Sequence, residues 1–484
     1  MNKTLLYFIG LILISCTSHA QSKNSALNRL FDSLAKEGQF NGTVLIADQG
    51  EIIFEGAYGY ADFEHKIQNT INTAFELASV SKQFTALAIM KLQSEGKLNY
   101  TDTITKYLPD LPYHSVTIND LIHHSSGISD FLGWTKEQMH LDKEVCNNQD
   151  IEKFLPSLAP KTIFEPGTFY TYSNTNYLLL ANIISKISGL SFPEYLKKNI
   201  FIKAGMNNTS IPMGHYQNFK PGGYAKNYLW DPLTHKYQPF NEIAPLDYYK
   251  LFSGTYGHAG IQSTVSDLYK WVEAIHQHKL VPETTFKVAF EPYLNKNGLD
   301  TIGMGQMPYT FGWLLVPKKD STPSFLWHNG GIGGYRSLIT YYPTINRVII
   351  LLQNTDQMMD ERSLMIPILD ILDRAKDIQW PKFSLKPKAS EVDSNYLKKL
   401  TGQYVMQDQP MIKMQITTKN GRLYAKYMDQ LPFEVYYQAD DTFFYTAVDA
   451  RLQFSQANES YKEVTLLQNG LKIKMTKTDD AGRK

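Results

Sequence analysis

Cysteine is scarce in this sequence. Its 484 residues include two cysteines, Cys16 and Cys146, which are too few for a disulfide framework or for a cysteine-rich zinc or iron–sulfur site. An excess of one charge is also lacking, because 48 basic and 47 acidic side chains leave a net charge of +1. Proteins that neutralise a phosphate backbone usually carry a basic excess. We therefore expect no nucleic-acid partner and no chemistry based on cysteine.

Several hydrolase and cofactor motifs are missing as well. The sequence contains neither a Gly-x-Ser-x-Gly elbow nor a His-Glu-x-x-His pair, the signatures of α/β-hydrolases and of zinc proteases. His123 and His124 are adjacent, and adjacent side chains on a helix diverge by about 100°, so one metal ion cannot readily bind both. The glycine run at residues 331–334 lacks the spacing and the following helix of a dinucleotide site. We expect neither a metal nor a cofactor.

One long apolar run, residues 5–14, follows a positively charged start. About 20 residues are needed to span a bilayer, so this run fits the core of a signal peptide over residues 1–20 better than a membrane span. Small residues at positions 18 and 20 allow cleavage before Gln21, whereas residues 13–16 resemble a bacterial lipobox that would attach a lipid to Cys16. We expect an exported protein, periplasmic or secreted, and leave both processing routes open beside retention as a membrane anchor.

The body of the chain predicts one sheet assembled from distant strands. Two strand–turn–strand patterns, at residues 43–55 and 337–352, are separated by a largely helical region. Apolar residues at helical spacing predict helices over residues 83–92 and 176–187, and Thr117 begins a capping-box pattern. The predicted fold class is α/β in the α+β sense: an antiparallel sheet flanked by helices, with a helical subdomain.

The pattern changes after residue 372, where a proline-containing linker leads into short strands and turns. Asn420-Gly421 and Asn469-Gly470 are strong hairpin signals, because both residue types tolerate positive φ. This part of the chain predicts a small antiparallel sandwich or barrel. The predicted divisions are 1–20 (signal peptide), 21–378 (first domain), 379–393 (linker) and 394–484 (small β domain).

The first candidate for chemistry is Ser79-Val80-Ser81-Lys82, at the start of the predicted helix over residues 83–92. Positions i and i+3 share a helix face, so Ser79 and Lys82 would lie side by side. A serine hydroxyl needs a base to become a nucleophile, and the free N–H groups at a helix start stabilise a developing oxyanion. Taken alone the pattern is weak, because an N-cap serine followed by a surface lysine has the same sequence.

Two further segments contribute polar residues. Tyr172-Ser173-Asn174 precedes the predicted helix over residues 176–187; Tyr172 would act as a base beside an ammonium group, and Asn174 would bind a substrate amide or hold Lys82. His328-Asn329-Gly330-Gly331 lies between two predicted strands, and its glycines let a substrate lie close to the strand edge. The alternative interpretations are that Tyr172 is an aromatic loop residue, that Asn174 caps a helix and that His328 is a structural histidine.

The order and spacing of these three segments resemble the serine β-lactamase and penicillin-binding-protein superfamily, above all its class C β-lactamase-like branch. The middle element is Tyr-x-Asn, as in class C, and the last is His-x-Gly in place of Lys-Thr-Gly. The resemblance covers roughly residues 26–375, and residues 394–478 resemble the small lipocalin-like β domain often appended to such hydrolases. Four more segments have the look of this branch: LIHHSSGI at 121–128, PGTFYTYSNTNYLLL at 166–180, GHAGIQSTVSDL at 257–268 and YTFGW at 309–313.

This resemblance implies an exported serine hydrolase that forms an acyl-enzyme on an amide or ester bond of a β-lactam, a D-amino-acid peptide or a small ester. Histidine at position 328 is mostly uncharged near neutral pH, unlike the lysine of the relatives. We therefore expect peptidase or esterase activity rather than efficient β-lactam hydrolysis. The implied site residues are Ser79, Lys82 and Tyr172 as catalytic groups, with Gly331, Asn174, His328 and Gly330 as oxyanion or substrate-binding groups.

A function of another class stays open. The chain could be a catalytically weak protein of the same fold that binds penicillin or senses cell-wall fragments. The joint presence of Ser79, Lys82 and Tyr172 favours the enzyme, because a decayed site need keep none of them. We expect a monomer that acts on a small-molecule or peptide substrate, with peptidoglycan-related material among the candidates. The sequence leaves open the substrate, which of Lys82 and Tyr172 is the base, and the role of the C-terminal domain.

Overall fold

A computed structural model describes most of the chain beyond the predicted signal peptide. Residues 1–20 with Cys16, the Asn469-Gly470 turn and most of the predicted linker lie outside the described residues. Among the described helices, none combines the length and the apolar character that a membrane span requires. The described residues are 22–212, 223–240, 247–297, 307–320, 322–356, 361–373, 378, 380, 388–428, 432–446, 450–457, 460–468 and 471–478.

The described residues fold into two compact units. The first contains those up to residue 129, from 136 to 227 and from 244 to 383; the second contains those from 130 to 135, from 228 to 243 and from 384 to 484. A hairpin from the middle of the chain therefore groups with the C-terminal strands. The predicted boundaries divide the chain once, whereas the second unit is built from three segments.

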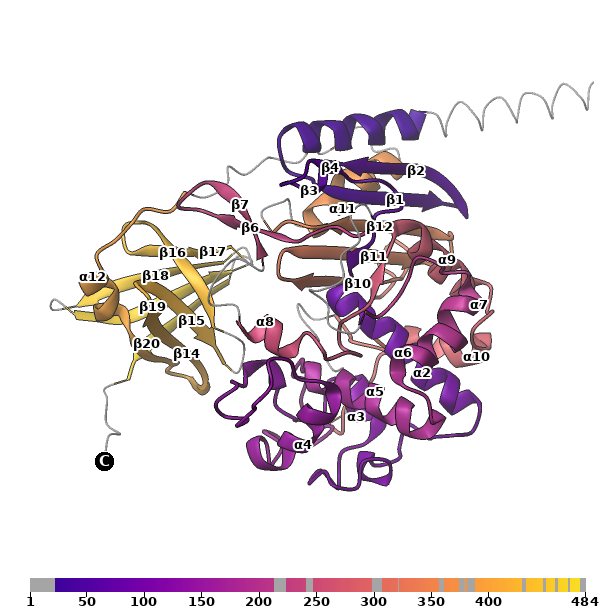
Figure 1. The fold of residues 1–484 in the computed structure, drawn as a ribbon, viewed down its shortest axis with the longest axis horizontal. Coiled ribbons are helices and arrows are strands. Elements are labelled where there is room, and N and C mark those ends of the chain that lie inside the picture. The colour runs from indigo at the N-terminus through magenta and orange to yellow at the C-terminus, as the bar shows by residue number, and fades with distance from the viewer. Residues whose placement is uncertain are drawn as a thin grey trace, which may run out of the picture. The chain divides into compact units, whose positions relative to one another are not determined.

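A six-stranded antiparallel sheet forms the centre of the first unit, in the order β2-β1-β12-β11-β10-β9 (Figure 1). β1 pairs with both β2 and β12, and its register places Val44 opposite Leu351. The predicted assembly of one sheet from strands far apart in the sequence is thus confirmed. The strands are β1 Gly42–Asp48, β2 Glu51–Tyr58, β9 Leu314–Val316, β10 Phe325–Ile332, β11 Tyr335–Tyr342 and β12 Arg347–Gln353.

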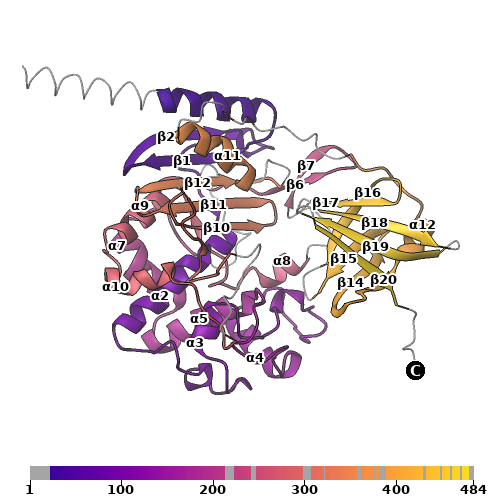
Figure 2. The same cartoon turned by 180° about the vertical axis from the view of Figure 1, so that it is seen from behind.

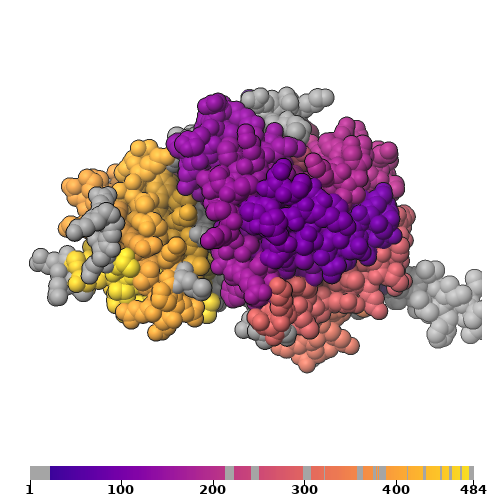
Figure 3. Space-filling view, turned by 90° about the horizontal axis from the view of Figure 1, so that it is seen from below, coloured from indigo at the N-terminus to yellow at the C-terminus, as the bar shows by residue number. Residues whose placement is uncertain are grey.

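The central strands are covered on both faces. Every residue of β1 and of β12 is buried, although side chains of a strand alternate between the two faces of a sheet. Helix α9 (Val265–His276) packs against β1 and β12, helix α11 (Glu361–Leu372) packs against β11, and Phe31 of the helix over residues 22–36 stacks on Phe54 of β2. Parts of the two halves of the chain also lie side by side on the surface. Figure 3 shows indigo and magenta parts of the first half against salmon parts of the second.

Helices make up most of the rest of the first unit. α3 starts with the predicted capping box of Thr117 and Asp120, and α5 ends at Gly189, whose φ is 69°. The helix predicted after Ser79 differs in its first turn, which is a 3₁₀ helix because the Val80 N–H bonds to Leu77 O. The remaining helices are η1 Ala78–Ser81, α2 Lys82–Ser94, η2 Ile104–Lys106, α3 Ile118–Ile122, α4 Asn148–Leu158, α5 Asn174–Ser188, α6 Phe192–Leu196, η4 Lys197–Phe201, α7 Ile202–Ala204, α8 Asp247–Phe252, α10 Glu283–Phe286 and η6 Lys287–Phe290.

Two short strand pairs complete the first unit around the sheet. β3 (Tyr60–Asp62) pairs with β4 (Ile67–Gln68), and β5 (Phe75–Glu76) pairs with β8 (Gln262–Ser263). The second pair joins the segment before Ser79 to a segment about midway along the chain. This pairing therefore holds the chain just before Ser79 in place.

The second unit is a closed eight-stranded antiparallel barrel in which each strand pairs with its neighbours in the sequence. The sequence left a sandwich and a barrel open, and the lipocalin-like barrel is the fold found. Asn420 and Gly421 take left-handed φ angles of 53° and 74° in the turn between β14 and β15, as the hairpin signal requires. The strands are β13 Gly402–Met406, β14 Gln409–Lys419, β15 Arg422–Tyr427, β16 Phe433–Ala439, β17 Thr442–Tyr445, β18 Ala450–Ala457, β19 Ser460–Gln468 and β20 Leu471–Lys477.

Apolar side chains fill the barrel. Alternate residues point inward, as Leu452 and Phe454 of β18 do. Helix α12 (Ser394–Leu400), which Figure 2 shows beside the strands of the barrel, adds Leu397 and Leu400 to the same core. Burying one such leucine contributes about 1.5–3 kcal/mol. The hairpin of β6 (Tyr228–Asp231) and β7 (Lys236–Pro239) and the short helix η3 (Phe131–Gly133) also belong to this unit.

Candidate active site

Ser79 sits in a turn that is held from two sides. Leu77 N donates to Ile261 O at 2.8 Å, and Ser337 Oγ on β11 donates to Leu77 O at 2.7 Å. Ala78 has a φ of +47°, a left-handed conformation that strains a residue with a side chain and that clusters at functional sites. The backbone around Ser79 is thus set by contacts with distant segments rather than by its own preference.

The Ser79 hydroxyl lies within hydrogen-bond distance of two of the predicted site residues. Lys82 Nζ donates to Ser79 Oγ at 3.1 Å, and the Tyr172 hydroxyl donates to the same oxygen at 2.9 Å. Lys82 reaches it from the first turn of α2, and Tyr172 reaches it from the loop before α5. An oxygen that accepts from an ammonium and from a phenol is surrounded by the groups that proton transfer needs.

Lys82 is completely buried and fixed by further bonds. Its Nζ donates to Asn174 Oδ1 at 2.9 Å and to the carbonyl oxygen of His258 at 2.9 Å. It also lies 4.7 Å from the centre of the Tyr172 ring, a distance at which a cation is attracted to an aromatic face. Of the two roles considered for Asn174, the geometry displays the one in which it holds Lys82.

His328 is neutral and fully engaged. Its Nδ1 bonds to Asn329 O, which can only accept, so Nδ1 carries the proton; its Nε2 then accepts from the Tyr309 hydroxyl at 3.1 Å. Burial, with the Lys82 charge as a second cause, lowers the pKa of His328 to about 3. The position that holds a lysine in the relatives' motif therefore presents no positive charge here.

Gly330 and Gly331 have different surroundings. A Cβ atom on Gly330 would clash with Leu77 O and lie 2.9 Å from Ser79 N, whereas a Cβ atom on Gly331 would meet nothing closer than Tyr335 O at 4.0 Å. Gly330 is therefore required for the close packing of β10 against the Ser79 turn. Gly331 is exposed on the same strand and leaves its surroundings open.

The adjacent histidines His123 and His124 lie close to this group. His123 stacks on Tyr293 at 4.2 Å and its Nδ1 bonds to Tyr309 O at 2.9 Å. The ring centre of His124 lies 4.3 Å from that of Tyr172. Burial lowers the pKa of His123 to about 4, and burial together with the Lys82 charge holds the pKa of His124 well below its usual range.

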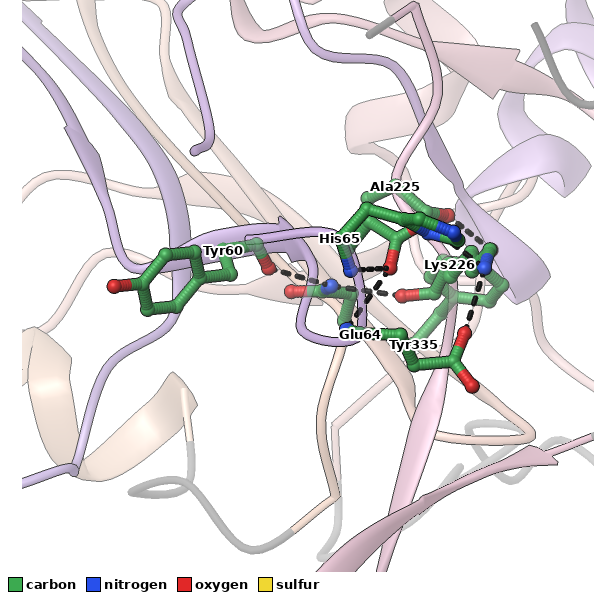
Figure 4. Close-up of polar contacts among 8 residues, drawn as sticks. Tyr60, Glu64, His65, Ala225, Lys226 and Tyr335 are labelled. Carbon is green, nitrogen blue, oxygen red and sulfur yellow. Dashed lines mark hydrogen bonds and ion pairs between the residues drawn. The ribbon is translucent and has the colours of Figure 1, made fainter. Parts of the chain in front are cut away.

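A polar cluster ties the connection between β3 and β4 to the segment before β6 (Figure 4). Lys226 Nζ bridges Asp62 and Glu64 at 2.9 and 2.7 Å. With His65, these two carboxylates form a group whose ligand atoms lie within 4.8 Å of one another, and the Lys226 ammonium supplies the positive charge between them. The Tyr335 hydroxyl, at the start of β11, donates to Ala225 O. This last bond attaches the residue next to Lys226 to β11, the strand that pairs with the strand carrying His328 and the glycines.

The structure brings Ser79, Lys82, Tyr172 and Asn174 into direct contact, packs Gly330 against Ser79 and bonds His328 to Tyr309. Three further residues lie at the site without having been predicted there from the sequence: Tyr309, His124 and His258. All three lie in segments that showed the family pattern, YTFGW, LIHHSSGI and GHAGIQSTVSDL. His258 acts through its carbonyl oxygen, which leaves no trace in residue type, so a sequence signal existed for the segments and not for the roles.

This chain is similar in sequence to several known proteins. A family model described as Beta-lactamase matches residues 27–372. Penicillin-binding protein 4* of Bacillus subtilis (strain 168) is 32% identical over 460 residues, a match that covers 95% of this chain and 99% of that protein. The teichoic acid D-alanine hydrolase of Staphylococcus aureus is 28% identical over 328 residues, which covers 67% of this chain and 72% of that protein.

One solved structure extends the likeness to both units. The octameric penicillin-binding protein homologue from Pyrococcus abyssi aligns with a TM-score of 0.61 and 22% identity, over 93% of this chain and 99% of that chain. At this identity the alignment is evidence for the fold. It includes the barrel as well as the sheet-and-helix unit.

Proposed function

This chain belongs to the β-lactamase family of serine hydrolases, which act through an acyl-enzyme, and from that premise we propose that Ser79 is its nucleophile. The observation that carries the proposal is the pair of hydrogen bonds that Lys82 and Tyr172 donate to Ser79 Oγ, at 3.1 and 2.9 Å. Lys82 and Tyr172 form a coupled pair that holds and moves the proton. Asn174 keeps Lys82 in place.

Acylation begins from the form of the Lys82–Tyr172 pair that has one proton fewer than an ammonium beside a phenol. Ser79 Oγ bonds to the substrate carbonyl carbon while its proton passes to this deprotonated pair. The carbonyl oxygen becomes an oxyanion, which the N–H groups of Ser79 and Gly331 stabilise; losing one such donor costs about 3–4 kcal/mol of transition-state stabilisation. The C–N or C–O bond then breaks, and the pair returns the proton to the leaving group. Water repeats these steps to release the acid and restore Ser79.

We propose a substrate without a carboxylate beside the reacting bond, such as a D-alanyl ester or amide. Members of this family act on peptide or cell-wall-related substrates, and one relative is a teichoic acid D-alanine hydrolase. His328 supports this choice, because its ring is neutral and makes two hydrogen bonds, and so offers no fixed charge for a substrate carboxylate. An efficient β-lactamase would be better served by a lysine at that position.

A pair of matched substrates tests this proposal. A peptide ending in D-Ala-D-Ala is offered with a free carboxylate and with an amidated C-terminus, next to a D-alanyl ester, and kcat/KM is measured for each. We expect the ester and the amidated peptide to be turned over faster than the free acid, and His328→Lys to reverse the order of the two peptides. No turnover of any substrate, with saturable binding, would instead identify a sensor of cell-wall fragments.

We also propose that the protein is exported and is a monomer, and we keep a lipid on Cys16 as one of two processing routes. The N-terminal pattern supports export. The mass of the mature chain distinguishes cleavage before Gln21 from lipidation of Cys16. The octameric relative makes the monomer worth testing directly: light scattering during size-exclusion chromatography should report a mass close to 55.3 kDa or less for a monomer.

A further inference from the structure

His124 holds the backbone on both sides of Tyr172. Its carbonyl oxygen accepts from Thr171 N at 2.9 Å, and its Nδ1 accepts from Ser173 N at 3.2 Å. These two N–H groups belong to the residues immediately before and after Tyr172. The main chain that carries the tyrosine is therefore attached to one residue, through one backbone and one side-chain bond.

The orientation of the His124 ring is set by a chain of polar groups. Ile128 N donates to Ser126 Oγ, which donates to Asn176 Oδ1 at 2.7 Å. The amide of Asn176 is thereby oriented so that its Nδ2 donates to His124 Nδ1 at 3.2 Å. Because Nδ1 accepts from two N–H groups, the ring is neutral and its proton resides on Nε2.

The same ring packs directly on the tyrosine. The ring centres of His124 and Tyr172 are 4.3 Å apart at an angle of 34°, and the Tyr309 ring lies 4.6 Å from His124 at 63°. His124 is completely buried, and its Nε2 has no hydrogen-bond partner among the described residues. The ring therefore contacts its neighbours in two ways: Nδ1 accepts hydrogen bonds, and the ring packs on Tyr172. The φ of His124 is +56°, a conformation that non-glycine residues adopt rarely and that clusters where function requires it.

We propose that His124 is a positioning residue for Tyr172, which keeps the tyrosine hydroxyl within reach of Ser79 Oγ. This inference rests on the proposed role of Tyr172 in proton transfer. His124 bonds to the backbone beside Tyr172 and packs on its ring, so it acts through the place and the angle of the tyrosine ring. A shift of about 1 Å in a group that transfers protons lowers the rate by about 100-fold.

Asparagine is the variant that isolates the ring. Asn tolerates a left-handed φ, and its side-chain oxygen can replace Nδ1 as the acceptor for Ser173 N. His124→Asn therefore keeps the backbone and the hydrogen bonds and removes the surface on which Tyr172 packs. His123→Asn is the matched control, because His123 is adjacent and buried and stacks on Tyr293 instead of Tyr172.

Steady-state kinetics with a D-alanyl ester test the proposal. We expect His124→Asn to lower kcat by about tenfold to 100-fold with KM changed by less than about threefold, because the substrate still binds while proton transfer is misaligned. His123→Asn should keep kcat within about threefold of the wild type. Thermal unfolding of both variants establishes that they fold, and His124→Gly, which also accepts this φ, replaces His124→Asn if that variant does not.

A double-mutant cycle separates positioning from a general loss of structure. In a Tyr172→Phe background, His124→Asn should lower kcat no further. A folded His124→Asn with wild-type kcat, or a loss of the same size in both backgrounds, overturns the proposal. If Tyr172→Phe itself retains wild-type kcat, the proposed role of Tyr172 is wrong. If Tyr172→Phe loses activity while His124→Asn keeps it, the role of Tyr172 stands and only the positioning role of His124 is overturned.

Discussion

The site in the first unit and the core of the barrel are built on opposite principles. Around Ser79 the buried groups include Lys82, His124 and His328, and Ala78 and His124 take left-handed conformations. In the barrel the core cluster consists of apolar side chains, and each strand pairs with its neighbour in the sequence. The difference teaches that the barrel is organised for stability, whereas the site accepts strain and buried polarity to hold reacting groups in place.

The largest expected effect comes from a methyl group on β10. Gly330→Ala puts a Cβ atom against Leu77 O and 2.9 Å from Ser79 N, which displaces the nucleophile and its oxyanion donor. We expect kcat to fall by about 100-fold to 1,000-fold. Gly331→Ala, on the next residue, meets open space and keeps its N–H, so its kcat should stay within about tenfold of the wild type. Equal losses in the two variants would show that Gly330 has no special place.

A core deletion in the barrel should have the reverse character. Leu452 is fully buried among the barrel residues, and Leu452→Ala is expected to lower the free energy of unfolding of the second unit by about 3 kcal/mol. The kcat of the folded variant should not change. Urea unfolding and initial rates on the same preparation measure both quantities. A large loss of kcat at a temperature where the variant is folded would contradict the division of roles.

The buried histidines make the first unit sensitive to acid. Burial lowers the pKa of His328 to about 3 and that of His123 to about 4, against about 6.5 in an unfolded chain. Between these values the unfolded state binds protons that the folded state does not, so stability falls as the pH drops from about 6.5 towards 3. Each such histidine contributes about 1.4 kcal/mol per pH unit in this window.

His328→Gln checks this linkage, because it removes one titrating group and keeps an acceptor for the Tyr309 hydroxyl. Urea midpoints of the first unit are compared at pH 7, 6 and 5 for the variant and the wild type. We expect the variant to lose stability less steeply as the pH falls. Parallel slopes would mean that His328 is protonated in the folded state as readily as in the unfolded one.

The smallest expected effect lies in the barrel turn. Gly421 has a φ of +74°, and a Cβ atom there would have nothing within 4 Å. Gly421→Ala therefore adds backbone strain without a clash, and we expect it to lower the free energy of unfolding by about 1 kcal/mol. Chemical denaturation of the second unit measures this. A loss comparable to that of Leu452→Ala would show that the turn determines the stability of the barrel as strongly as its core does.

The same comparison explains what could be predicted from the sequence. Hairpins depend on neighbouring residues, so the turn at Asn420 and the strands beside it followed from local pattern. Ser79, Lys82 and Tyr172 could be named because their spacing resembles a known family. The grouping of residues 228–243 with the barrel could not, because it depends on packing between segments far apart in the chain.

The site also contains elements that no residue pattern encodes. Lys82 is held by the carbonyl of a residue 176 positions away, and a carbonyl is the same for every residue type. The tautomer of His328 depends on its two hydrogen-bond partners. His124 belongs to a segment that could be singled out, but its hold on Tyr172 appears only once residues 171 and 173 are placed against it.

Covalent labelling of Ser79 tests the central claim most directly. The wild type and Ser79→Ala are treated with a fluorophosphonate, and the labelled peptide is identified by mass spectrometry after digestion. The proposed mechanism predicts one label, on the Ser79 oxygen of the wild type, and none on the variant. A Ser79→Ala protein that is labelled as strongly as the wild type would contradict it.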